Sequence, residues 1–174
     1  YVDAYRTFGE KRFLETAEKN LNFLLTQQKK DDGGLWHSHK EGKSSINGFL
    51  EDYCFTIEAL VAMYEATFEI KWLNEAKALA NYTIDKFYDE KTQMFFFNSS
   101  DDEQLIARKT EVMDNVIPAS NSSMAKGLFY LGHYFDNQRF LDISTQMLNN
   151  VKPNMASYGS GHSNWAILML HHTF

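Results

Sequence analysis

The sequence predicts an all-α fold of about three helical hairpins with short β-hairpins in the long loops. Three observations lead to this prediction. A short motif, with aromatic residues on both sides of a polar turn, occurs at residues 7–14, 67–73 and 134–141. Amphipathic stretches follow the motifs, and stretches that are apolar on nearly all sides alternate with them. The recurrence of one unit along a chain indicates a repeated helix pair.

The amphipathic stretches predict outer helices over residues 13–29, 71–88 and about 137–149. In the first of these, Phe13 and Leu21 recur on one helical face, and charged residues occupy the opposite face. This pattern is typical of a helix with one buried side.

The apolar stretches predict inner helices over residues 49–68, 122–135 and 163–171. Apolar residues surround these helices, as expected for helices that pack among other helices. The chain therefore alternates a dry inner helix with a half-exposed outer helix.

The connections between the predicted helices alternate in length. Each inner helix leads into its outer helix through a few residues, whereas long loops join outer to inner helices. In an array of antiparallel hairpins the long loops share one face, which also holds the amino ends of the inner helices. These ends attract carboxylates and ligand oxygens, and long loops often carry function. The long loops are residues 30–48, 89–119 and 151–161.

Two pieces of these loops have strand-like sequences, residues 34–39 and 94–98. Residues 105–108 are a candidate partner for the second piece. Short β-hairpins here would satisfy backbone groups above the helix ends.

Composition narrows the function classes. The chain has 174 residues, 17 Lys and Arg against 23 Asp and Glu, and a net charge of −6, so nucleic acid is not an expected partner. The single cysteine, Cys54, excludes an intrachain disulfide framework and predicts a reducing compartment. No apolar run is long enough for a membrane span, and residues 1–9 do not resemble a signal peptide, so we expect a cytoplasmic protein without a membrane partner.

Two segments carry a family resemblance. Residues 48–55 read Gly-Phe-Leu-Glu-Asp-Tyr-Cys-Phe, and residues 114–122 read Asp-Asn-Val-Ile-Pro-Ala-Ser-Asn-Ser. Together they resemble the α/α-toroid part of the thioredoxin-domain-containing, spermatogenesis-associated proteins. The resemblance implies a toroid similar to N-acylglucosamine 2-epimerase and six-hairpin glycosidases, preceded by a thioredoxin-like domain.

This chain has no Cys-x-x-Cys pair and helices for about three hairpins rather than six. We therefore expect residues 1–174 to form one partial α/α-toroid domain, a fragment of a longer chain. The expected partners are the remainder of the toroid and the thioredoxin-like domain. Apolar helix edges left uncovered would favour self-association.

Three residues at the predicted inner-helix starts are candidate catalytic groups: Asp52, Asp114 and His162. A carboxylate at such a position suits general acid or base chemistry, and histidine carries protons near neutral pH. A glycosidase needs two carboxyl groups across a bond, and Asp52 with Asp114 is the best pair available. The alternative is that these side chains only cap helices.

Other polar and aromatic residues of this face are candidates for contacts with sugar hydroxyls or sugar faces. The His37 and His39 pair gives only a weak metal signal, so neither a metal nor a cofactor is expected. The candidate substrate-binding residues are Trp36, His39, Glu51, Tyr53, Asn121, Ser122 and Trp165.

Two functions remain open from the sequence. One is a carbohydrate-binding or carbohydrate-modifying domain of epimerase or glycosidase type, whose ligand is a carbohydrate. The other is a non-catalytic scaffold or interaction module that serves the thioredoxin-like partner. The sequence does not decide whether the domain is an enzyme. The two are separated by whether the candidate residues converge on one open site.

Overall fold

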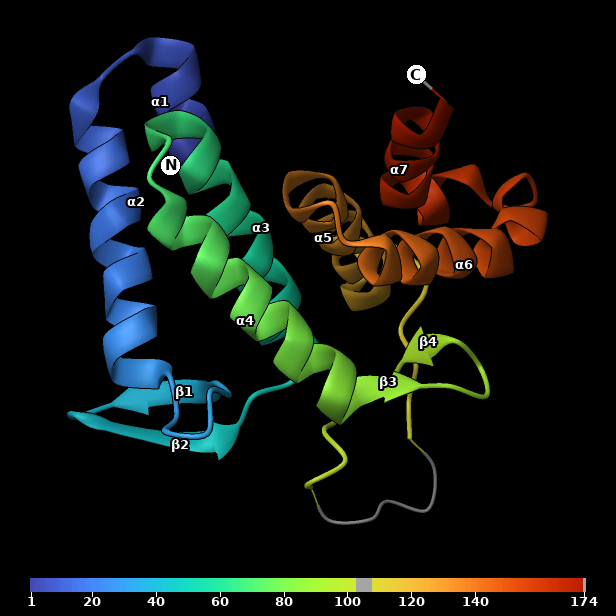
Figure 1. Cartoon of the computed structure of the whole chain (residues 1–174), viewed down its shortest axis with the longest axis horizontal. Coiled ribbons are helices and arrows are strands. Elements are labelled where there is room, and N and C mark those ends of the chain that lie inside the picture. The colour runs from blue at the N-terminus through green and yellow to red at the C-terminus, as the bar shows by residue number, and fades with distance from the viewer. Residues whose placement is uncertain (103–107, 174) are drawn as a thin grey trace.

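The computed structural model describes residues 1–102 and 108–173, which fold into an array of helices with two small β-hairpins at one end (Figure 1). The all-α prediction is confirmed. The helices are α1 (Val2–Phe8), α2 (Lys11–Phe23), α3 (Leu50–Thr67), α4 (Ile70–Phe87), α5 (Ser120–Phe135), α6 (Gln138–Met155) and α7 (Ser163–Thr173).

The repeated motif forms the turn between paired helices. Gly9, Phe68 and Asp136 end α1, α3 and α5 in the left-handed conformation. Each N–H of these three residues donates to the carbonyl four residues earlier, which closes the last helical turn. The chain then reverses into α2, α4 or α6. One turn geometry is therefore used three times.

Helix α1 is the inner member of the first hairpin, and the sequence did not predict it. Its Arg6 guanidinium donates to the Ala62 carbonyl at 3.2 Å and to the Glu65 carboxylate at 2.7 Å, so α1 lies beside the inner helix α3. A stretch of seven residues is too short to show an apolar pattern of its own.

The core lies between the inner and outer layers. Helix α3 packs against both its hairpin partner α4 and the next inner helix α5, and α5 packs against α6. Large side chains from both layers are fully buried. Examples are Tyr53, Leu60, Trp72, Phe87, Phe140 and Trp165.

Small β-hairpins occur in the first two long loops. Strand β1 (Trp36–Lys40) pairs antiparallel with β2 (Lys43–Asn47), and β3 (Tyr88–Asp89) pairs with β4 (Met94–Phe95). The pairing of β4 with β3 was not predicted, and it arises because a turn closed by Asp89 and Thr92 brings the chain straight back onto β3. Residues 105–107 of the proposed partner lie outside the described residues.

Helix ends differ from the predicted ones mainly in α6. This helix continues to Met155 and contains Pro153, whereas the sequence indicated an end near residue 149. Proline lies here in the last turn, where the helix continues for only two further residues. None of the helices in the described ranges is long and apolar enough to cross a membrane.

Candidate functional site

The amino ends of α3, α5 and α7 are joined by one connection, the segments 94–98 and 109–114 between β4 and α5. The Leu50 N–H donates to the Phe97 carbonyl at 2.9 Å, and the Asn121 N–H donates to the Glu111 carbonyl at 3.4 Å. The Asn164 N–H donates to Asp114 Oδ2 at 2.8 Å. These three helix starts therefore meet along one connection, as the alternating loop lengths predict.

Asp114 joins the amino ends of α5 and α7. Its Oδ1 accepts from the Ala119 N–H at 2.8 Å and from the Ser122 hydroxyl at 2.7 Å, while Oδ2 accepts from the Asn164 N–H. The Asp114 N–H in turn donates to the Gly161 carbonyl. Only 8% of Asp114 is exposed, so its carboxylate is buried among donors from two helices.

Three further candidates belong to the same buried network. The Asn121 amide group exchanges two hydrogen bonds with the backbone of Phe95 and also donates to the Glu111 carbonyl. The Trp165 indole donates to the Val112 carbonyl at 2.8 Å. His162 Nδ1 lies 2.9 Å from the Tyr158 carbonyl.

In this network the buried candidate residues are hydrogen-bonded to other groups of the protein. The polar groups of Asp114, Asn121 and Ser122 are hydrogen-bonded within the protein, and His162 and Trp165 are buried beside them. A ligand would have to displace these bonds to reach them. Their catalytic and substrate-binding roles stay predictions. The hydrogen bonds of all but His162 join different elements, whereas His162 contacts the carbonyl of Tyr158, four residues earlier.

The amino end of α3 is built differently. The Asp52 carboxylate accepts from the Phe49 N–H at 2.8 Å, which caps the helix, and lies 3.0 Å from His37 Nδ1 on strand β1. The side chains remain partly open, with 22% of Asp52 and 36% of His37 exposed. The first β-hairpin thus places an imidazole beside a carboxylate at the end of an inner helix.

Opposing effects act on the Asp52 carboxyl. Burial raises its pKa, while the hydrogen bonds from His37 and from the Phe49 N–H lower it and leave a smaller net rise. An ionised Asp52 can only accept, so the proton of a neutral His37 lies on Nδ1. This arrangement leaves the Nε2 lone pair of His37 as a base, because Nε2 has no hydrogen-bond partner within residues 1–102 and 108–173.

Aromatic rings flank this pair. The His37 ring meets the Phe49 ring edge-on, with centroids 4.9 Å apart, and Phe49 stacks on Phe97 at 5.0 Å. The Lys109 ammonium lies 5.8 Å from the Phe97 centroid. Flat apolar surface therefore adjoins the titratable groups.

Two further carboxylates approach the same place. Burial raises the pKa of Glu51, and the negative charges of Asp52 and Glu111 raise it further. Glu111 also pairs with Lys109 at 2.6 Å. Glu111 was not predicted, because no periodic pattern marks its loop and only the fold brings it near α3.

The remaining candidates lie beside this site or beneath it. The Trp36 ring contacts the Lys30 ammonium at 5.2 Å, and His39 Nδ1 lies 2.8 Å from the Ser44 hydroxyl. The Tyr53 hydroxyl accepts from the Leu35 N–H at 2.8 Å, and burial raises the Tyr53 pKa strongly. Tyr53 therefore anchors the first long loop to α3.

The pairing of His37 with Asp52 was also not predicted. The sequence drew attention to His37 as half of a histidine pair, and the structure separates the contacts of His37 from those of His39. In the described part of the chain, no three His, Cys, Asp or Glu side chains are grouped to hold a metal ion.

Solved structures with the same arrangement of helices identify the architecture. A family 76 glycoside hydrolase (mannosidase) from Bacteroides thetaiotaomicron matches 88% of this chain and 41% of its own, with a TM-score of 0.71 and 17% identity. The chain has the fold of an α/α toroid. The cellobiose 2-epimerase of Bacillus thermoamylovorans matches with a TM-score of 0.67, 17% identity, and coverage of 85% of this chain and 40% of its own.

The unsaturated glucuronyl hydrolase of a Bacillus species is a further α/α toroid that matches, with a TM-score of 0.63, 14% identity, and coverage of 88% of this chain and 43% of its own. At these identities the likeness concerns the fold. This toroid domain spans about two fifths of each of these solved chains.

Curated relatives confirm the sequence resemblance. Spermatogenesis-associated protein 20 of mouse is 30% identical over 109 residues, which are 62% of this chain and 14% of the relative. An uncharacterised protein of Caenorhabditis elegans is 26% identical over 162 residues, 88% of this chain and 22% of the relative. The toroid domain thus spans less than a quarter of these relatives. No protein-family profile matches it.

Proposed function

We propose that this domain binds and modifies a carbohydrate at the amino end of α3. The observation that carries the proposal is the pair formed by His37 and Asp52 beside stacked aromatic rings. An oriented imidazole, nearby carboxylates and flat apolar surface are the groups that sugar chemistry uses. The solved toroids that share this fold include a mannosidase and a sugar epimerase, which supports a carbohydrate as the ligand class.

In this proposal His37 is the base. Its Nε2 takes a proton from the sugar or from an attacking water, while the Asp52 carboxylate holds the Nδ1 proton and stabilises the imidazolium that forms. Glu51 is the complementary acid, because a raised pKa favours its protonated form. Phe49 and Phe97 provide the apolar surface for the sugar ring.

The same groups can serve epimerisation or hydrolysis. We therefore propose a carbohydrate ligand and proton transfer by these groups, and we do not choose between the two reactions. Asp114, which the sequence suggested as catalytic, stands outside this mechanism because its carboxylate binds donors from two helices. His162, the other suggested group, is buried, with Nδ1 2.9 Å from the Tyr158 carbonyl four residues earlier, and it has no role in this mechanism. We further propose that the domain works as part of a longer protein, with the remainder of the toroid closing the site.

Calorimetric titration of the chain with a panel of mono- and disaccharides tests this proposal. We expect at least one sugar to bind, and its affinity to fall about tenfold or more in Asp52→Asn and His37→Ala, which corresponds to about 1.4 kcal/mol. His133→Gln, a change on exposed surface of α5, is the control and should retain the affinity of the unmodified chain. Absence of binding by every sugar, or equal affinity in all variants, would contradict the proposal.

A second function has one observation in its favour. Four of the predicted site residues form hydrogen bonds that join α5 or α7 to neighbouring segments, as expected of a scaffold: Asp114, Asn121, Ser122 and Trp165. A non-catalytic module of a thioredoxin-domain-containing protein would need these contacts and no open His–Asp pair. The sugar titration separates the two functions, because a scaffold gives no sugar binding.

A further inference from the structure

The first hairpin has helices of unequal length. Inner helix α1 has seven residues, whereas the inner helices α3 and α5 have 18 and 16. Its partner α2 has 13 residues and continues as a π-helical turn from Leu24 to Gln28. The far half of α2 therefore has no inner helix of its own hairpin beside it. At 1.5 Å per residue, the missing length is about 15 Å.

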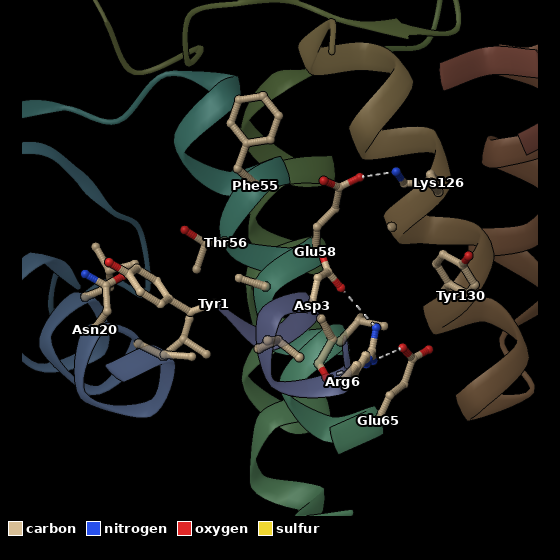
Figure 2. A pocket seen from close by; sticks show the side chains of 18 residues that line it. Tyr1, Asp3, Arg6, Asn20, Phe55, Thr56, Glu58, Glu65, Lys126 and Tyr130 are labelled. Atoms are coloured by element: carbon tan, nitrogen blue, oxygen red, sulfur yellow. Dashed lines mark hydrogen bonds and ion pairs between the residues drawn. The ribbon is translucent and has the colours of Figure 1, made fainter. Parts of the chain in front are cut away.

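A cavity of about 580 Å³ lies where that inner helix would continue. Figure 2 shows the cavity with Tyr1 on one side, and with the Glu58 carboxylate directed at the Lys126 ammonium on another. Side chains of α2, of the π-helical turn after it and of α3 line the cavity, and they include an apolar set. This set is Ala17, Leu21, Leu24, Phe55, Ala59 and Val61.

The members of this apolar set differ in how far they are buried. Ala17, Leu21 and Val61 are buried, whereas Leu24, Phe55 and Ala59 are only partly covered. Half-covered apolar side chains around a cavity indicate a surface built to receive another apolar group.

The wall on the side of α5 is polar. The Lys126 ammonium lies 2.8 Å from Glu58 on α3 and donates to Asn164 on α7 at 3.0 Å. An occupant of the cavity must therefore present an apolar stripe to α2 and α3 and polar side chains to Glu58 and Lys126. An amphipathic helix has these two faces.

We propose that the cavity is the seat of an amphipathic helical segment of about ten residues that lies in line with α1. A longer form of the chain supplies this segment in cis, in agreement with the small share of the curated relatives that the toroid domain spans. With the segment in place, the first hairpin becomes as long as the others. The proposal is independent of any sugar chemistry.

The test adds ten helix-forming residues before Tyr1 of the full 174-residue chain. In one version, Leu and Ala form a stripe at helical spacing that faces Leu24 and Phe55; in the control version, the same residues are reordered so that no stripe forms. We expect the striped extension to raise the melting temperature by about 5 °C or more, and the control to change it by less than about 1 °C.

A second substitution locates the effect. Leu24→Lys should remove most of the gain in the striped version and change the unextended chain much less, because Leu24 is already partly exposed there. Equal melting temperatures for the two extensions would overturn the proposal. It would also be overturned if sedimentation showed a dimer of the unextended chain that Leu24→Lys dissociates, because the occupant would then be a second copy.

Discussion

Two inner-helix starts in this molecule carry an aspartate, and they use it in opposite ways. Asp114 is closed in by donors from α5 and α7, and its carboxylate joins the two helices. Asp52 caps only its own helix, and its carboxylate also lies 3.0 Å from Nδ1 of the partly exposed His37. The comparison teaches that an acid at a helix start stays available for chemistry when its carboxylate accepts only one backbone hydrogen bond from the helix end.

The charged groups around Asp52 and Asp114 also differ. At the start of α3, Glu51, Asp52 and Glu111 bring several negative charges together, and the pKa values of Glu51 and Asp52 are raised. At the start of α5, backbone and hydroxyl donors compensate the buried charge of Asp114. Unfavourable charge is therefore concentrated at the open site, as is common where proteins carry function.

The largest expected effect comes from removing each carboxylate in turn. Asp114→Ala leaves the buried N–H groups of Ala119 and Asn164 without an acceptor, so the free energy of unfolding should fall by about 3 to 5 kcal/mol. Asp52→Ala removes one cap and a partly exposed pair, and should cost about 1 kcal/mol. Urea unfolding of both variants measures the difference.

Asp114→Asn provides a milder version, because the amide retains one acceptor oxygen and should give a loss between the other two. Equal losses for Asp114→Ala and Asp52→Ala would show that the two helix starts are not built differently.

A smaller effect concerns Glu51 and pH. Because its pKa is raised in the folded protein, Glu51 supports folding below its unfolded pKa, near 4, and this contribution is lost as the pH rises through the folded value. Glu51→Gln should therefore match the unmodified chain at pH 4 and be more stable at pH 7, by less than about 1 kcal/mol. Unfolding curves at both pH values check this, and a variant that is less stable at pH 7 would contradict it.

Much of the fold was predictable because it repeats. The left-handed turn residues Gly9, Phe68 and Asp136 lie at one position of the motif, four residues before Phe13, Trp72 and Phe140, so local chemistry specifies each hairpin. Apolar patterns then separate inner from outer helices. Helix α1 was not predicted because it packs against α3, which is distant in the sequence. Arg6 of α1 contacts the Ala62 carbonyl, 56 residues away.

The candidate site was predictable only in part. A helix start with acids could be read from residues 48–55, but the sequence does not show which donors surround each acid. The pairing of His37 with Asp52 depends on how β1 folds over α3, and the approach of Glu111 depends on a connection with no periodic pattern. Tertiary contacts, not residue types, decide which aspartate stays open.

The most direct test of this account is to map the amide NMR signals of the chain during titration with a sugar that binds it. We predict that the signals of His37, Phe49 and Asp52 shift with sugar concentration, while those of Ala119 and Asn164 stay in place. Shifts centred on Ala119 and Asn164, with the α3 end unchanged, would contradict the assignment of the open site to His37 and Asp52.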